Sequence, residues 1–441
     1  MLYRFLFKKI DNSSLILFRI CFGILIACES YGAIITGWVK RTLIEPKFTF
    51  SFIGFEWLQP LPGNGMYFYF FIMGTLGLLI ALGYKYRLSM LSFAVLWTGV
   101  YLMQKSSYNN HYYLLVLISF IMVFLPANKA VSLDAKTHPK IASNAMPNWV
   151  KWLIILQLFI VYTYASVAKI YGDWLDFSFI AMLMKGKANY PIIGAWLQTP
   201  WIHKVIATFG ILFDFLIVPA LLWKPTRNIA FAFAIFFHLF NSIVFQIGIF
   251  PYLSLAFVAF FYDGTTIKNI FFKKKVAYTG NEIATAKYLP LFYTITMMYF
   301  ALQLTLPIRH YFIKDDVLWT EEGHRMSWRM MLRNRVGLMQ FKVVNKTTNK
   351  EFRVNLNDYV TKKQRRMLIS HPDFIWQFAQ RLKKEYAEKG ETIEVYAQHS
   401  KISINGKRYE PFIDGNVNLA AVPWQQFTHH EWILPSPYLK K

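Results

Sequence analysis

Long apolar stretches alternate with short polar segments over the first 308 residues of the chain. About 20 consecutive apolar residues are needed to cross the hydrocarbon core of a bilayer, so each stretch of roughly that length is a candidate span. Nine candidates cover residues 13–36, 64–83, 88–104, 109–126, 148–170, 201–223, 226–246, 247–262 and 289–308. The pattern predicts a polytopic α-helical membrane protein with about nine transmembrane helices in a domain over residues 1–308.

The pattern changes after Pro307, and residues 309–441 are polar with scattered aromatic residues. Helical periodicity over 372–389 predicts one helix, and Asn405-Gly406 is typical of a two-residue hairpin turn. The expected strands cover residues 340–344, 351–356, 392–397, 401–404 and 407–412. The C-terminal part is therefore predicted to be an α+β domain outside the membrane.

The distribution of Lys and Arg predicts the orientation. With a cytoplasmic N-terminus, the inner loops carry more basic residues than the outer loops, as the positive-inside rule requires. Nine spans then place residues 309–441 on the extracytoplasmic side. The first apolar stretch follows Lys8 and Lys9 and lacks a small-residue cleavage site, so we expect an anchor and not a removed signal peptide.

Composition supports a membrane location. Hydrophobic residues make up 55% of the chain and charged residues 16%, against about 25% charged residues in a soluble protein. The formal charge of +24 is explained in part by the inner loops, so no nucleic-acid partner is expected. The only cysteines, Cys21 and Cys28, lie in one apolar stretch, which predicts no disulfide framework.

Two outer loops, 37–63 and 171–200, are long and rich in Trp, Phe, Tyr and Pro. Aromatic side chains favour the membrane interface. These loops are expected either to form part of a lid or vestibule or simply to anchor the protein at the interface.

Lys169 closes the fifth apolar stretch, where its neighbours in the sequence are uncharged. Burial should lower the pKa of this lysine, and a neutral amine can act as a general base. The alternative is a lysine whose long side chain reaches the outer interface.

Other polar residues lie where lipid is expected. Asn109, Asn110 and His111 open the fourth stretch and suit either a polar ligand such as a quinol or simple helix capping. His238 and Asn241 lie three residues apart on one helix face, where they can bind a ligand or form an interhelical hydrogen bond.

Three charged residues remain within the apolar stretches. We expect Arg19 and Asp214 to pair across helices and fix the bundle, whereas Glu29 has no predicted partner. No histidine or cysteine has the spacing of a metal site, and no nucleotide-binding or serine-hydrolase motif is present.

Several ordered segments resemble the vitamin K-dependent gamma-glutamyl carboxylases and their bacterial relatives, which share an HTTM-type membrane domain. The matching segments are residues 18–23, 55–62, 107–111, 166–169, 172–174, 237–242, 247–250, 306–307, 310, 327–331 and 422–424. They span about 400 residues, so the resemblance covers nearly the whole chain.

The resemblance implies an enzyme with a lipid-like cofactor. Family members oxidise reduced vitamin K (the hydroquinone) with O2, and the resulting strong base removes a γ-proton from a peptide glutamate. Addition of CO2 gives γ-carboxyglutamate and the quinone epoxide. The implied partners are a glutamate-containing peptide or protein and the lipid bilayer, and no metal is implied.

The resemblance also assigns residues. Lys169 matches the base that deprotonates the hydroquinone. Quinol binding is assigned to Asn110, His111, His238, Asn241 and Met331. The glutamate substrate is assigned to His310, Trp328 and Arg333.

The chain departs from animal members of the family at three points. Ala168 stands where they have a second lysine, and His324 and Arg333 replace a tyrosine and a histidine. The sequence also lacks their C-terminal extension and their interdomain disulfide, which favours a bacterial-type gamma-glutamyl carboxylase.

Two other functions are considered. The altered residues near Trp328 suggest a quinol epoxidase or redox membrane protein that lacks carboxylation. A transporter is the second alternative, and the absence of an internal repeat counts against it.

Overall fold

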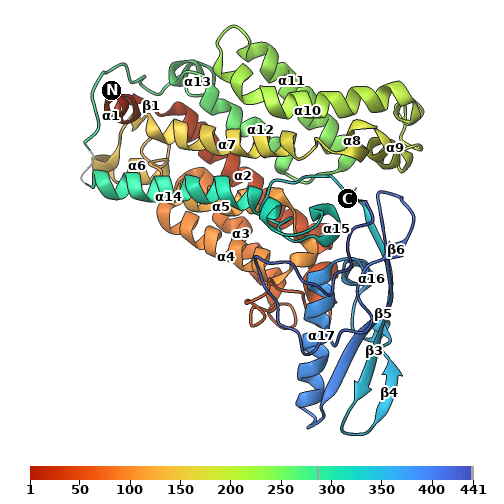
Figure 1. Ribbon diagram of the computed structural model, residues 1–441. Coiled ribbons are helices and arrows are strands. Elements are labelled where there is room, and N and C mark those ends of the chain that lie inside the picture. The colour runs from red at the N-terminus through yellow and green to blue at the C-terminus, as the bar shows by residue number, and fades with distance from the viewer. Residues whose placement is uncertain (286–287, 439–441) are drawn as a thin grey trace.

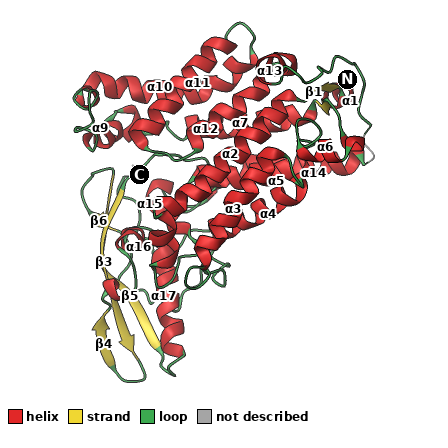
Figure 2. Ribbon diagram, turned by 180° about the vertical axis from the view of Figure 1, so that it is seen from behind, coloured by secondary structure: helices red, strands yellow, loops and turns green. Residues whose placement is uncertain are grey.

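The computed structural model describes residues 1–285 and 288–438. Figures 1 and 2 show a bundle of long helices and, below one end of it, a domain that contains the main β-sheet. The N-terminus and the short helices α1, α6 and α13 lie at the opposite end of the bundle (Figure 1).

Every predicted apolar stretch forms a helix. These helices are α2 (Ser13–Ile35), α3 (Gly65–Leu82), α4 (Tyr86–Met103), α5 (Asn110–Phe124), α7 (Trp149–Val167), α10 (Pro200–Leu222), α11 (Arg227–Phe240), α12 (Phe250–Phe257) and α14 (Leu289–Ile308). Short helices are α1 (Leu2–Phe7), α6 (Leu133–Thr137), α8 (Gly172–Leu175), α9 (Ser178–Lys185), α13 (Gly264–Phe271), α15 (Val317–Thr320) and α16 (Lys362–Leu368).

Six helical segments of the described chain are long and apolar enough to cross a membrane. They are α2, α3, α7, α10, α11 with its π-helical extension to Phe245, and α14 with its extension to Phe312. Helix α5 and the segment Phe250–Phe261 are apolar but shorter. The predicted count of about nine spans is therefore not confirmed, because these two segments are short and α4, although as long as α3, is less apolar.

Small residues allow close contact between α2 and α3. A Cβ atom built on Gly23 would lie 2.4 Å from the backbone nitrogen of Ala81, and one built on Gly77 would lie 2.8 Å from that of Ala27. Replacing either glycine would push the two backbones apart. Close contact through small residues is a common way for helices to pack in membranes, where lipid competes equally well for larger apolar side chains.

The C-terminal domain contains a four-stranded antiparallel sheet with the order β4-β3-β5-β6. Its strands are β3 (Arg335–Asn345), β4 (Lys350–Arg353), β5 (Ile393–Ile404) and β6 (Glu410–Pro411), and a small separate sheet pairs β1 (Lys9–Asp11) with β2 (Ala145–Pro147). Helix α17 (Pro372–Ala387) packs on the main sheet through Phe374, Phe378 and Leu382. The predicted helix, hairpin and α+β architecture are confirmed.

One prediction about the sheet was wrong. Residues 392–397 and 401–404 were expected to form two strands, but β5 is continuous across both. The polar residues between them are accommodated by a bulge opposite Leu338 and Gln340 and by a left-handed backbone at His399, with φ +52°. The hairpin at Asn405-Gly406 is confirmed, since both residues have positive φ and β6 pairs back onto β5.

The outer loop 37–63 contributes to the core of the C-terminal domain. Phe48 and Phe50 are buried there, and the ring of Phe50 lies 4.8 Å from that of Phe374 on α17. Lys105, in the loop after α4, also pairs with Asp373 at the start of α17. The hydrophobic core of the C-terminal domain therefore includes residues that precede the predicted domain boundary between residues 308 and 309.

Candidate functional site

An apolar cavity of about 630 Å³ lies among α7, α10 and α11 and the segments that follow them. We name it the Lys169 cavity. Its polar residues are Lys169, Asp214, Tyr162, His111, His238 and Asn241. The outer loop 171–200 contributes Trp174, Ile180 and Trp196 to its wall.

Lys169 follows the C-terminal end of α7 and is buried. Its Nζ atom donates hydrogen bonds to the carboxylate of Asp214 on α10 and to the carbonyl oxygen of Ala165, the latter at 3.1 Å. The ammonium also lies 5.5 Å from the ring centre of Trp174. The neighbours of Lys169 in the sequence are uncharged, but α10 brings a carboxylate that the sequence around Lys169 does not reveal. The lysine side chain is buried inside the bundle.

The predicted pair between Arg19 and Asp214 was also wrong. Arg19 is fully buried, and its guanidinium donates to the carbonyl oxygens of Ala81, Ala127, Ala130 and Val131 at 2.6–3.4 Å. Ala81 lies in the last turn of α3, and the other three residues belong to the segment after α5. The two terminal nitrogens of Arg19 thus bond to backbone oxygens, whereas Asp214 pairs with Lys169.

The three polar residues at the start of α5 have separate positions. Asn109 is the helix cap, and its side-chain oxygen accepts a bond of 2.7 Å from the backbone N–H of Tyr112. Asn110 donates to the carbonyl oxygen of Arg329 at 3.0 Å and therefore ties α5 to the C-terminal domain. His111 lines the Lys169 cavity, where its ring stacks on Phe250 with 3.8 Å between ring centres.

His238 and Asn241 both line the Lys169 cavity. The Nε2 atom of His238 lies 3.2 Å from the Tyr162 hydroxyl on α7, which is an interhelical hydrogen bond. Its Nδ1 atom is buried with no hydrogen-bond partner in the described chain. Asn241 begins the π-helical segment Asn241–Phe245, and such segments are frequent at functional sites because they redirect side chains.

Met331 also lines this cavity, on a segment with an unusual backbone. Met326, Trp328 and Met331 have φ values of +57°, +57° and +52°. Left-handed conformations are costly for residues other than glycine and persist only where the surrounding structure imposes them. The segment is therefore held in a defined shape against the mouth of the Lys169 cavity.

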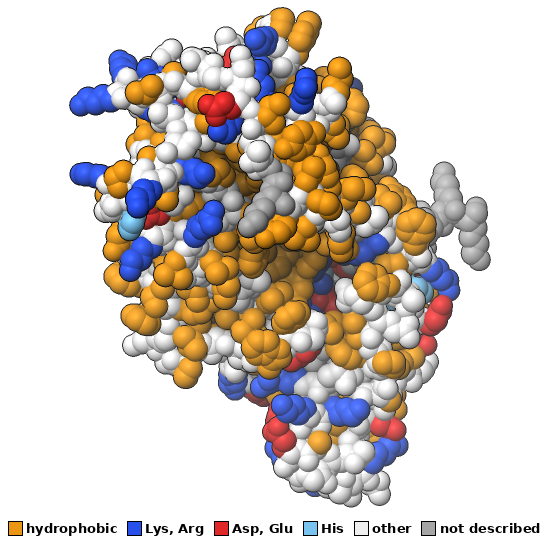
Figure 3. Space-filling view, turned by 90° about the vertical axis from the view of Figure 1, so that its left-hand side faces the viewer, with side chains coloured by type: hydrophobic (Ala, Val, Ile, Leu, Met, Phe, Trp, Pro, Cys, Tyr) orange, Lys and Arg blue, Asp and Glu red, His pale blue; other side chains and the backbone are white. Residues whose placement is uncertain are grey.

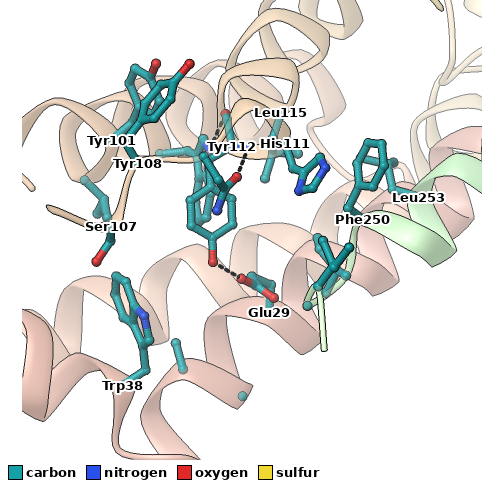
Figure 4. Close-up of a pocket in the computed structure, with 18 of the residues that line it drawn as sticks. Glu29, Trp38, Tyr101, Ser107, Tyr108, His111, Tyr112, Leu115, Phe250 and Leu253 are labelled. Carbon is teal, nitrogen blue, oxygen red and sulfur yellow. Dashed lines mark hydrogen bonds between the residues drawn. The ribbon is translucent and has the colours of Figure 1, made fainter. Parts of the chain in front are cut away.

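A second cavity, of about 650 Å³, shares the walls formed by His111, Phe250 and Met331 with the first. We name it the Glu29 cavity. Figure 4 shows the Tyr112 hydroxyl directed at the carboxylate of Glu29, with which it forms a hydrogen bond of 2.7 Å. Glu29, unassigned by the sequence, thus has a phenol as its partner.

A third cavity, of about 420 Å³, lies between the bundle and the C-terminal domain, and we name it the junction cavity. His111 and Met331 line it too, so these two residues border all three cavities. None of the described residues that line it is Asp or Glu. Its cationic residues are Lys105, Arg325, Arg329, Arg333, Arg335, Lys363 and Arg366.

Two buried carboxylates lie behind this wall. Burial alone would raise the pKa of Asp373, but Arg325 and Lys105 outweigh it and hold that pKa below its usual range. Burial likewise opposes ionisation of Glu321, and Arg333 with its neighbours holds the pKa well below the usual range. Both carboxylates therefore carry a negative charge at neutral pH.

Besides His111, two histidines from the C-terminal domain line the junction cavity, and both are neutral at that pH. Burial lowers the pKa of His371 to about 3, and burial also lowers the pKa of His324 well below its usual value. Burial lowers the pKa of Lys105 to about 8. Most cations of this wall are arginines, whose charge is permanent and suits the binding of an acidic ligand.

The residues assigned to the glutamate substrate are not gathered in one place. Arg333 lines the junction cavity and forms a bidentate ion pair with Glu321. His310 bonds to the carbonyl oxygen of Pro307 at 2.9 Å, and its Nε2 atom lies 3.4 Å from a guanidinium nitrogen of Arg329. Trp328 is buried against Tyr113, with 5.0 Å between ring centres. Neither His310 nor Trp328 lines the three cavities described.

Several residues of the site were missed by sequence reasoning. Asp214 was identified as charged but was given the wrong partner. Arg325, Arg329 and Arg335 were not selected, although four arginines fall within eleven residues of a segment that also contains Trp328. That local density of arginine was the available signal. Within the described chain, no group of three or more His, Cys, Asp or Glu residues is placed to hold a metal ion.

These features define a class of protein: a helical membrane bundle with an apolar cavity whose mouth is covered by an α+β domain. Residues 7–265 match the HTTM domain family, and residues 288–438 match the vitamin K-dependent gamma-carboxylase, lumenal domain. The chain belongs to the vitamin K-dependent gamma-glutamyl carboxylase family, which confirms the resemblance. No solved structure matches the chain.

The lumenal-domain match and the apolar helices together indicate an integral membrane protein with an extracytoplasmic C-terminal domain. The cytoplasmic position of the N-terminus stays a prediction from the distribution of Lys and Arg.

Proposed function

We propose that the protein carboxylates glutamate side chains of a peptide or protein, using vitamin K hydroquinone, O2 and CO2. The observation that carries the proposal is the convergence of Lys169, Asp214, His111, His238 and Met331 on one apolar cavity. Membership of the carboxylase family supports the same reaction.

The Lys169 cavity fits a quinol. Its walls are almost entirely apolar, which suits an aromatic ring with a hydrocarbon tail. The buried Nδ1 atom of His238 lacks a hydrogen-bond partner in the described chain, and a ligand hydroxyl would supply one. When bound and oxidised by O2, the hydroquinone supplies a base strong enough to take a γ-proton from glutamate.

The Lys169–Asp214 pair is the proposed acceptor of the first proton. The fully protonated pair would be an ammonium with a carboxylic acid. With one proton fewer, the pair exists either as ammonium with carboxylate or as amine with carboxylic acid. In both forms it accepts one proton from a ligand hydroxyl: on Asp214 in the first form and on Lys169 in the second.

The junction cavity is the proposed entrance for the acidic peptide. Arg329 and its cationic neighbours attract carboxylates, whereas Glu321 and Asp373 lie behind them and keep the arginines in place. Met330, Met331 and His111 border both this cavity and the Lys169 cavity. The substrate glutamate would therefore approach the cofactor across these three residues, and the apolar lining limits quenching of the base by water.

The test is an assay of the purified protein with reduced vitamin K, labelled CO2 and a glutamate-containing peptide. The proposal expects label in the peptide and an equal amount of epoxide, both absent from a Lys169→Ala variant. Epoxide without fixed label would instead support the quinol epoxidase. Absence of both products from the folded wild-type protein would contradict the proposal.

A further inference from the structure

A fourth cavity lies at the end of the bundle remote from the C-terminal domain. It has a volume of about 920 Å³ and lies between two segments far apart in the sequence, 129–144 and 270–275. We name it the lysine cavity. Figure 3 shows this end of the molecule, where Lys and Arg side chains gather with hydrophobic side chains between them.

The charge of the lysine cavity is uncompensated. Five lysines line it, and none of the described residues in its wall is Asp or Glu. Lys275 is buried and bonds to Asp11 at 2.8 Å, so its charge is already neutralised. The other four form no ion pair with the described part of the chain. They are Lys129, Lys136, Lys273 and Lys274.

Both walls are fixed from within the protein. Arg19 donates to the carbonyl oxygens of Ala127, Ala130 and Val131, which holds the first wall against α2. The backbone N–H of Ser143 bonds to the carbonyl oxygen of Lys129 at 2.8 Å and closes this wall on itself. The Lys275–Asp11 pair anchors the second wall. The backbone that carries the lysines is thus held in place before any ligand binds, which reduces the conformational entropy lost on binding.

The cavity has an apolar side as well. Val131, Ile270 and Phe271 line it with 47%, 60% and 56% of their surfaces exposed. A soluble anion would gain nothing from these side chains. A molecule with an anionic head and hydrocarbon chains would contact both the lysines and the apolar residues.

We propose that the lysine cavity binds the phosphate headgroup of an anionic phospholipid, with the acyl chains lying against Val131, Ile270 and Phe271. Basic pockets beside membrane helices bind such headgroups through short-range attraction to phosphate. The group that the lysines recognise is a phosphate, which either a phospholipid or free inorganic phosphate could supply. The exposed apolar side chains favour the phospholipid. The intramembrane Arg19 acquires a role here, because it shapes the wall that carries Lys129.

The test measures lipid binding to the full-length protein in detergent by native mass spectrometry. Phosphatidylglycerol and phosphatidylcholine with the same acyl chains are compared for the wild type and for K273Q/K274Q. The expected result is preferential binding of phosphatidylglycerol, weakened about tenfold in this variant. The matched control is K140Q/K224Q, which removes the same charge from two exposed residues that do not line the cavity and should bind as the wild type does.

Four further results test the proposal. The K273R/K274R variant keeps the charge and should retain binding, which separates loss of charge from misfolding. Equal weakening in K140Q/K224Q would overturn the proposal in favour of diffuse surface attraction. Displacement of the lipid by an equal concentration of inorganic phosphate would overturn it in favour of a free-phosphate site. Lack of any preference between the two lipids would overturn it outright. None of these results depends on carboxylation.

Discussion

Buried charged groups are paired differently in the Lys169 cavity and at the junction cavity. In the first, a single lysine meets a single carboxylate among apolar side chains. In the second, each carboxylate serves more than one cation: Asp373 pairs with Lys105 and Arg325, at 2.7 and 2.8 Å. A shared carboxylate among always-charged arginines fixes structure, whereas an isolated pair between two groups that can each lose their charge can move a proton.

The largest effect is expected at the isolated pair. Lys169→Ala should lower hydroquinone oxidation by at least about 10³-fold, because a positioned base contributes about 10²–10⁴-fold and no other amine lines this cavity in the described chain. Epoxide formation by the purified variant measures it. Lys204→Ala, at an exposed position on α10, is the control and should keep full activity. Unchanged epoxide formation in Lys169→Ala would remove Lys169 from the mechanism.

The next effect is on stability, at the junction. Asp373→Ala should destabilise the protein by about 3–5 kcal/mol, since it leaves the buried Lys105 and Arg325 without their carboxylate. Thermal unfolding in detergent measures the change. Asp358→Ala removes an exposed carboxylate of the same domain and should cost little. Equal destabilisation by the two substitutions would show that the ion pairs of Asp373 contribute no more to stability than an exposed carboxylate does.

A smaller change in rate is expected from Asp214→Asn. The pair loses one of its two proton-accepting groups, so kcat should fall by about 10–100-fold. Steady-state turnover of the hydroquinone by the purified variant measures kcat. An unchanged kcat would mean that Asp214 only supports the local structure.

The smallest effect is expected at His111, which borders all three cavities and stacks on Phe250. His111→Leu should raise KM for the hydroquinone about tenfold with a smaller change in kcat, because it alters a wall and not the proton acceptor. Steady-state kinetics measures both constants. His138→Leu, at an exposed position, is the matched control. A loss confined to kcat would instead give His111 a part in proton transfer.

Sequence predicted the helices well because hydropathy is a local property. All nine apolar stretches form helices, whereas their status as spans depends on both length and apolar character. Helices α5 and α12 are short, and α4 is less apolar than α3. The continuity of β5 was not predicted, because the polar residues 398–400 are compatible with either a bulge inside one strand or a loop between two strands.

The candidate site was predicted only in part. Lys169, His111, His238, Asn241 and Met331 do line one cavity, and the resemblance had selected them. Their roles stay predictions. The partners were not predictable, because the bond between Lys169 and Asp214 joins residues 45 positions apart, and nothing local distinguishes Asp214 from Glu29 as a partner.

The insertion of Phe48 and Phe50 into the second core has a consequence for how the chain is made. These phenylalanines emerge from the ribosome some 300 residues before α17, against which they pack, so they stay uncovered during most of synthesis. The outer domain can finish folding only after it meets a loop translated long before it. Exchanging that domain between relatives therefore requires exchanging this loop as well.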